Sequence, residues 1–164
     1  MKYLLLFLMT SFINSYGQTN ADILIRGMSK AQSGNHYGAI ANFSKCIKID
    51  STDSYPYFYR GISKHKLGDN NNALIDLNKA LKIEPSGDFI LKYRAALKMS
   101  IKDYYGAISD YTRILEISSK NYYAYALMGI AKVRLGDINS GCEDFNLAKS
   151  KGIDVSKLIK ICSL

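Results

Sequence analysis

Apolar residues recur along this chain at the spacing of an α-helix that buries one face. Ile40, Phe43 and Ile47 fall at positions i, i+3 and i+7, and the same spacing returns further along the chain with Leu at every position. This spacing places the apolar side chains on one stripe of a helix. The pattern predicts a chain of amphipathic helices that pack through that stripe.

Five columns of small or apolar residues keep a 34-residue period through four copies. The fixed period predicts a solenoid of helix–turn–helix units, each with two antiparallel helices of about 13 residues. Stacked units bury a common core and typically present an extended binding surface. The columns are Gly27, Gly61, Ala95 and Gly129; Gly34, Gly68, Lys102 and Gly136; Ala39, Ala73, Ala107 and Gly141; Phe43, Leu77, Tyr111 and Phe145; Cys46, Ala80, Ile114 and Ala148.

The second copy also carries the residues of a known repeat at matching places: Tyr57, Gly61, Leu67-Gly68-Asp69, Ala73, Leu77, Ala80 and Pro85. On these residues the chain resembles the tetratricopeptide repeat family, over about residues 20–156. The resemblance implies an all-α fold, a right-handed α-solenoid of four repeats at about residues 20–53, 54–87, 88–121 and 122–153. The chain departs from the family pattern in having no Trp, one closing Pro, and Lys102 at the mid-repeat glycine position.

The C-terminal residues carry one further apolar stripe. Val155, Leu158, Ile159 and Cys162 fall at i, i+3, i+4 and i+7, which predicts a short helix at about residues 154–163. We expect this helix to cap the array by covering the exposed face of the fourth repeat. Repeats and cap together form one domain, residues 18–164, long enough to bury a core.

The N-terminal residues read as a signal peptide, residues 1–17. A basic start at Lys2 precedes an apolar run from Tyr3 to Ile13, and small residues at Ser15 and Gly17 suit cleavage before Gln18. The alternative is a membrane anchor, but the run is far shorter than the roughly 20 residues that a spanning helix needs. We predict an exported protein, periplasmic or extracellular and soluble after cleavage, of the bacterial envelope.

The three cysteines are Cys46, Cys142 and Cys162. Export permits disulfides. Cys142 lies in a column expected to face the cap, and Cys142 and Cys162 are equally far in sequence from Gly152, the expected turn between them. We favour a disulfide between them, worth roughly 3 kcal/mol in the chain-entropy model; the alternative is two buried thiols. Exported tetratricopeptide proteins look similar here. Cys46 is predicted to be a buried apolar side chain.

The formal net charge is +8, but the basic residues are scattered, which disfavours a nucleic-acid surface. Arg60 with Asp76, and Arg94 with Asp110, share one spacing that predicts an ion pair between the two helices of a repeat. Four lysines also keep the repeat period. We interpret them as aliphatic stems packed between repeats with charged ends in water, and the alternative is a basic ridge that attracts anionic partners. They are Lys30, Lys64, Lys98 and Lys132.

The family resemblance also implies a binding groove, because the first helices of its repeats line the concave face. Carrying those columns over gives a groove rich in aromatic and basic residues, which are common anchors of interfaces. The alternative for each aromatic residue is that it packs between repeats as part of the core. The known carboxylate clamp of some family members is absent, since its positions hold apolar or aromatic residues such as Met28 and Tyr93. The predicted groove residues are Tyr55, Phe58, Tyr59, Ile62, His65, Lys66, Phe89, Lys92, Tyr93, Tyr123 and Arg134.

No motif indicates catalysis, since the sequence has no HExxH, no phosphate-binding glycine loop and no two cysteines close together in sequence. His36 and His65 lie far apart in sequence, so we expect no metal site and no cofactor. We predict a non-enzymatic adaptor that binds a partner protein or an extended peptide through its concave face, with nucleic acid disfavoured. The alternatives are a structural component of an envelope assembly that uses convex or end faces, and a basic-surface binder of anionic partners.

Overall fold

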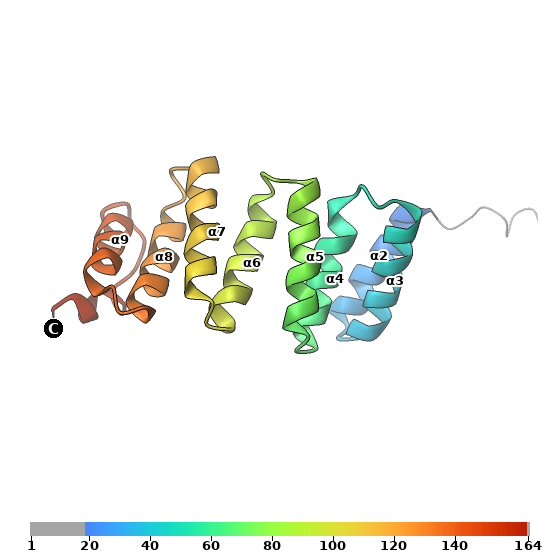
Figure 1. The fold of residues 1–164 in the computed structure, drawn as a ribbon, viewed down its shortest axis with the longest axis horizontal. Coiled ribbons are helices and arrows are strands. Elements are labelled where there is room, and N and C mark those ends of the chain that lie inside the picture. The colour runs from blue at the N-terminus through green and yellow to red at the C-terminus, as the bar shows by residue number, and fades with distance from the viewer. Residues whose placement is uncertain (1–18, 164) are drawn as a thin grey trace, which may run out of the picture.

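The computed structural model describes residues 19–163, and the predicted signal peptide lies outside the described residues. Within that range the chain forms eight α-helices and one 3-10 helix, with no strand. The helices succeed one another in an elongated row, an α-solenoid of four helix pairs (Figure 1). The elements are α2 (Asn20–Gln32), α3 (His36–Ile49), α4 (Ser54–Lys66), α5 (Asn70–Ile83), α6 (Asp88–Ser100), α7 (Tyr104–Ile117), α8 (Tyr122–Arg134), α9 (Ile138–Ser150) and η1 (Ile159–Ser163).

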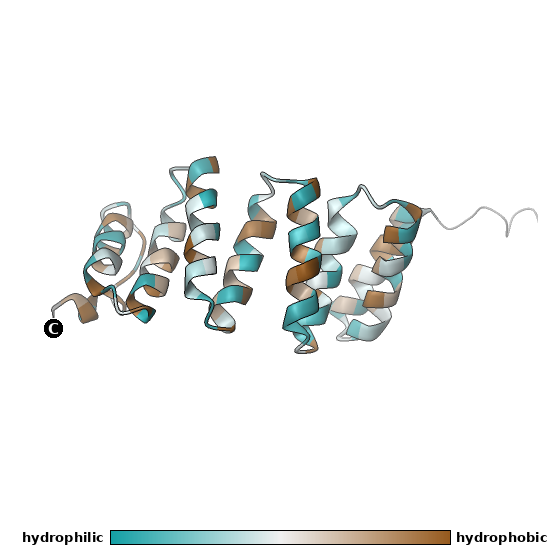
Figure 2. Ribbon diagram, in the orientation of Figure 1, coloured by the Kyte–Doolittle hydropathy of each residue, from teal (hydrophilic) through white to brown (hydrophobic). Residues whose placement is uncertain are grey.

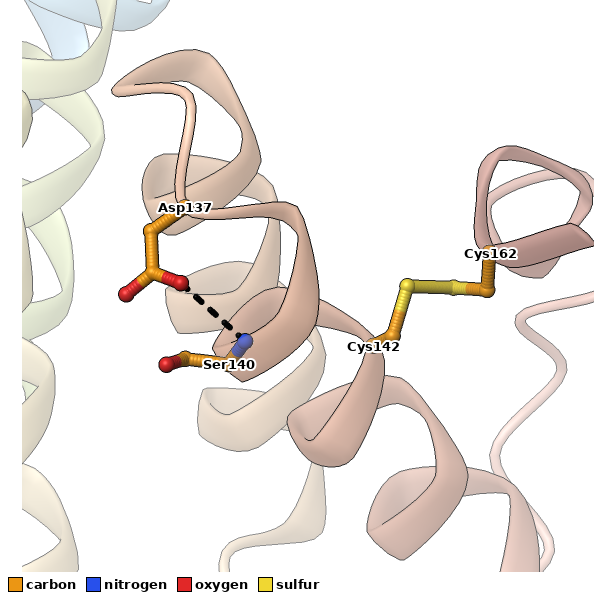
Figure 3. Close-up of a disulfide and its surroundings, with 4 residues drawn as sticks. All are labelled: Asp137, Ser140, Cys142 and Cys162. Carbon is orange, nitrogen blue, oxygen red and sulfur yellow. Dashed lines mark hydrogen bonds between the residues drawn. A yellow bond between two sulfur atoms is a disulfide. The ribbon is translucent and has the colours of Figure 1, made fainter. Parts of the chain in front are cut away.

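The even-numbered helices open the repeats and are called A helices here; the odd-numbered ones are B helices. Each B helix begins with an Asn or Asp cap whose side chain accepts a hydrogen bond from the backbone three residues on, as between Asp137 and the Ser140 amide at 3.2 Å (Figure 3). Such a cap satisfies a backbone donor that the first helical turn leaves unpaired. The caps therefore set where every B helix starts.

The turn before each cap needs a left-handed backbone. Gly68 and Gly136 have φ of 82° and 90°, at little steric cost for glycine. In repeat three this position is Lys102, whose φ is 65°. A residue with a Cβ is disfavoured there by roughly 1–2 kcal/mol. The turn geometry is thus the same in every repeat, and repeat three holds it with strain.

The predicted columns are the core. Ala39, Ala73 and Ala107 have no exposed surface, and Phe43 and Phe145 are 0% and 1% exposed. Hydrophobic and hydrophilic residues are interspersed along the helices, as Figure 2 shows. The main core runs from repeat two into α8, and a second cluster joins α8 and α9 to the C-terminal segment.

The small columns bring the two helices of a repeat close together. At Gly129, an added Cβ would lie 2.8 Å from the backbone oxygen of Gly141 and 2.7 Å from the Phe145 ring. Real Cβ atoms do not approach backbone oxygens that closely, so α8 and α9 can pack at this separation only with glycine here.

The C-terminal cap differs from the prediction. The expected helix at about residues 154–163 is wrong in extent, because only Ile159–Ser163 is helical and it is a 3-10 helix. Asp154 Oδ1 accepts from the Ser156 amide at 3.0 Å, which makes a turn instead of a first helical turn. A segment this short gains little from helical hydrogen bonds alone, so packing decides its shape. Val155 is 2% exposed and packs beside Phe145.

A disulfide joins Cys142 of α9 to Cys162 of η1, as the sequence favoured (Figure 3). The two Cα atoms lie 5.7 Å apart, and 20 residues separate the cysteines in sequence. The bond ties the C-terminal segment across the last helix. Cys46 is buried and forms no disulfide; its Sγ donates to the Asn20 carbonyl oxygen at 3.6 Å. No helix within residues 19–163 has the length and hydropathy to cross a membrane.

Candidate binding surface

Buried carboxylates on the B helices are held by cations from the A helix of the same repeat. Asp110 is fully buried, and Arg94 donates to both of its oxygens, from Nε to Oδ2 at 2.9 Å. Lys98 Nζ also lies 2.9 Å from Oδ2. The predicted Arg–Asp pairs are confirmed, and the lysine is an additional partner. Repeat two has the same cluster, formed by Asp76, Arg60 and Lys64.

The clusters in the two end repeats are incomplete. In repeat four, Met128 stands at the arginine position, and Lys132 Nζ lies 2.7 Å from Asp144 Oδ2. Burial raises the pKa of Asp144 above its ordinary value, although Lys132 lowers it in part. Repeat one has Asn42 at the carboxylate position. Three of the four periodic lysines therefore pair with carboxylates, so they do not form a free basic ridge.

The arginines of repeats two and three also bond to the preceding repeat. Arg60 Nη1 donates to Ser44 Oγ at 3.0 Å, and Arg94 Nη1 donates to Asn78 Oδ1 at 2.5 Å. Each guanidinium therefore bonds both within its repeat and to the B helix before it. These cations are satisfied inside the molecule and stabilise the array.

Aromatic side chains of α4 and α6 meet across the boundary between repeats two and three. The Phe58 ring centroid lies 4.9 Å from that of Phe89 and 5.8 Å from that of Tyr93, both edge-on. Tyr55 stacks on Phe89 at 5.7 Å, and Tyr59 lies 5.2 Å from Phe58. We call these five residues the aromatic cluster. Each such pair adds about 0.5–1.5 kcal/mol beyond area burial, so the cluster fixes the two repeats to each other.

The cluster has a buried base and an exposed edge. Phe58 is 9% exposed and belongs to the core, whereas Tyr55 is 46% exposed. Tyr59, Phe89 and Tyr93 are half-buried. Burial raises the pKa of Tyr93 above its ordinary value, and its hydroxyl can donate a hydrogen bond. The cluster thus offers both apolar ring surface and hydroxyl groups to the outside.

His65 extends this surface along α4. Its ring centroid lies 6.1 Å from that of Tyr93, and its Nδ1 is 2.7 Å from Asn70 Oδ1. Ile62 is half-buried against the core, and Lys66 is exposed at the end of the helix.

A cavity of about 270 Å³ lies between α6, α7 and α8. Two predicted groove residues, Lys92 and Tyr123, are part of its lining, and Tyr123 is 64% exposed. Lys92 Nζ pairs with the exposed Asp88 at 2.6 Å. Burial raises the pKa of Tyr111, which also lines the cavity, to about 12. The full lining is Lys92, Tyr111, Ile114, Asn121, Tyr123, Ala124 and Leu127.

The predicted groove residues fall into three groups along the A helices. The aromatic cluster and His65 come together, Lys92 and Tyr123 line the cavity beside α8, and Arg134 is exposed at the far end of α8. No group of three or more His, Cys, Asp or Glu in residues 19–163 is placed to hold a metal ion. The lysine–aspartate pairs were missed, although one constant 12-residue spacing relates Lys64, Lys98 and Lys132 to their partners.

Comparison with known proteins agrees with this architecture. Residues 57–86, which cover most of repeat two, match the family model described as the tetratricopeptide repeat. Four stacked helix pairs share one sequence period with that matched repeat. The chain therefore has the fold of a tetratricopeptide repeat solenoid.

Solved structures resemble this chain in fold. A crystal structure of MamA superposes with a TM-score of 0.78 at 18% identity, covering 90% of this chain and 86% of that one. A tetratricopeptide repeat protein from Parabacteroides merdae gives 0.75 at 21% identity, covering 84% and 54%. The first TPR of Spaghetti (RPAP3), bound to the HSP90 peptide SRMEEVD, gives 0.67 at 21%, covering 73% and 94%. No curated protein matches this chain by sequence.

Proposed function

We propose that this protein is an exported, non-enzymatic adaptor that binds an extended segment of a partner protein along its A helices. One observation carries the proposal: α4, α6 and α8 expose aromatic and cationic side chains that the core does not require. Tyr55 and Tyr123 are 46% and 64% exposed, and Lys66 and Arg134 are exposed without an ion pair among residues 19–163. Tyrosine and arginine are frequent anchors of protein interfaces.

The partner chemistry follows from these residues. Stacked rings favour apolar side chains, and nearby cations favour carboxylates. The RPAP3 repeat was solved with an acidic peptide. In this chain, however, clamp positions hold residues such as Met28 and Tyr59. We therefore expect recognition of side chains along a segment instead of a chain-terminal carboxylate.

Export is supported by the N-terminal sequence and by the disulfide. Residues 1–17 have the order of a signal peptide. The Cys142–Cys162 bond persists best in an oxidising compartment. Expression of the full chain with a C-terminal tag, followed by N-terminal sequencing of the exported protein, should give Gln18 as the first residue. Retention of the intact chain inside the cell would contradict export.

Site-specific photocrosslinking tests the binding face. The crosslinking residue p-benzoylphenylalanine replaces Tyr55 or Tyr123 on the A helices of the full-length protein, which is then irradiated in its native envelope. Both positions should give an adduct with the same partner. If neither gives a specific adduct, the A helices are not the binding face.

The chain supplies a matched control and a second candidate function. Tyr37 and Tyr105 on B helices are each 76% exposed, and Ile75 on α5 is 62% exposed. These residues favour the alternative of a structural component held by its B-helix face. Specific adducts from Tyr37 or Tyr105 alone would establish that alternative and reject the adaptor proposal.

A further inference from the structure

A cavity lies at the C-terminal end of the solenoid. It has a volume of about 460 Å³ and sits between α8, α9 and the C-terminal segment. Its walls are apolar, formed by Ile130, Val133, Phe145, Leu158 and Ile161. A volume of this size falls within the usual range of about 300–1,000 Å³ for ligand pockets. We call it the terminal pocket.

The terminal pocket exists because the cap is small. Between repeats two and three, Phe58 fills the boundary by packing on Phe89 and Tyr93 of the next A helix. After repeat four, the place of a 13-residue A helix is taken by a five-residue 3-10 helix. A 13-residue α-helix would span about 20 Å, whereas a five-residue 3-10 helix spans only about 10 Å. Part of the apolar face of α8 and α9 is therefore left uncovered.

The pocket has a rigid outer wall. The Cys142–Cys162 disulfide fixes η1, which carries Ile161, to α9. Val155, 2% exposed, anchors the segment that leads to Leu158. A wall held this way keeps the pocket open in the absence of a ligand, so binding need not order the segment first.

Two cations complete the lining, Arg134 from α8 and Lys157 from the C-terminal segment. Both are exposed, and neither forms an ion pair within residues 19–163. Arg60 and Arg94 differ, because buried aspartates of the chain satisfy them. Arg134 and Lys157 are therefore available to pair with carboxylates of another molecule, and the formal net charge of +8 favours an acidic partner.

We propose that the terminal pocket binds an acidic segment of a partner protein. One apolar side chain enters between α8 and the C-terminal segment, and flanking carboxylates pair with Arg134 and Lys157. Because Ile130 and Arg134 stand two repeat periods from the groove positions Ile62 and Lys66 on α4, the pocket continues the A-helix face. The inference rests on the proposed adaptor function and names the partner chemistry at one end of that face.

Fluorescence anisotropy with the oxidised, full-length protein tests this assignment. The probe is a pool of fluorescein-labelled nine-residue peptides with Leu, Ile or Phe at the centre and Asp or Glu at the flanking positions. Two control pools replace the centre by Ser or the flanks by Lys. We expect the acidic apolar pool to bind about tenfold or more tightly than either control. Equal binding of the three pools would overturn the proposal.

Charge-matched variants locate the site. Arg134→Glu/Lys157→Glu should weaken binding of the acidic apolar pool by about tenfold or more. Lys48→Glu/Lys82→Glu makes the same change in net charge on exposed B-helix ends and should leave affinity within about twofold. Equal weakening by the two variants would show nonspecific attraction and overturn the proposal. Arg134→Gln/Lys157→Gln provides the same test if the charge reversals disturb folding.

Two further outcomes separate this proposal from others. Binding to phosphatidylglycerol vesicles that depends on Arg134 and Lys157, without peptide binding, would overturn the peptide assignment in favour of a lipid surface. If peptide binding fails while Tyr55 and Tyr123 still crosslink to a partner, the terminal-pocket proposal is wrong and the adaptor function stands.

Discussion

The buried cluster around Asp110 offers the sharpest test of what holds a repeat together. The change Asp110→Asn keeps the side-chain shape but removes the charge that Arg94 and Lys98 share. Those side chains are only 12% and 15% exposed, so they cannot fully regain water. Removing one partner of a buried pair typically costs about 3–5 kcal/mol. Because both cations keep some solvent contact and Asn78 still accepts from Arg94, we expect a loss of about 2–4 kcal/mol.

Urea denaturation followed by circular dichroism measures this loss. With a slope of about 2 kcal/mol per molar, the midpoint should fall by roughly 1–2 M. A second probe, tyrosine fluorescence, should give the same transition, since long repeat arrays do not always unfold in one step.

The surface provides a matched control. Asp88→Asn also removes one carboxylate, but its partner Lys92 and Asp88 itself are 50% and 47% exposed. Exposed pairs contribute little, so we expect a loss below about 1 kcal/mol, including the effect on the first turn of α6. If Asp110→Asn and Asp88→Asn shift the midpoint equally, the buried cluster does not stabilise the repeat and the reasoning fails.

Three further changes have definite expected outcomes. Lys102→Gly should relieve the strain of the left-handed backbone and raise the free energy of unfolding by about 0.5–1 kcal/mol. Thermal unfolding should show this as a rise in Tm of about 2–4 °C. An unchanged or lower Tm would contradict the strain. Gly129→Ala should lower the free energy of unfolding in urea by about 1–3 kcal/mol, because the new Cβ would meet the Gly141 oxygen. The control Ala95→Gly, in the same column, should lower it by less than about 1 kcal/mol. Equal losses would show that α8 and α9 tolerate a wider separation. The folded pKa of Asp144 is raised, so its contribution to stability is present below its ordinary pKa of 3.8 and is lost as pH rises through the folded value. The stability of Asp144→Asn relative to the wild type should therefore be higher at pH 7 than at pH 3. If the difference in Tm between the two proteins is the same at both pH values, the assignment is refuted.

Sequence reasoning recovered the features that the repeat period records. The buried columns, the turn glycines and the Arg60–Asp76 pair return from one repeat to the next, so each copy supports the assignment of the others. The disulfide could be favoured because Cys142 and Cys162 are symmetric about Gly152.

The features that do not repeat could not be obtained in the same way. The C-terminal segment occurs once, and its apolar spacing fits a helix, but the Asp154 turn and the tie to α9 determine its backbone. The cavity beside α8 and the terminal pocket depend on the distance between neighbouring helices. A pattern of residue types does not predict that distance. Phe58 illustrates the same limit, since its column predicts a groove position and its packing against Phe89 buries it.

The carboxylate clusters also bear on the order in which the array assembles. Repeats two and three have complete clusters and share the aromatic cluster, whereas Asn42 and Met128 interrupt the pattern in repeats one and four. In an array whose stability is a sum of units and their neighbours, folding begins where local stability is greatest. The central repeats should therefore nucleate folding, and amide hydrogens there should exchange most slowly. The disulfide secures the C-terminal end, which leaves repeat one as the part that frays first.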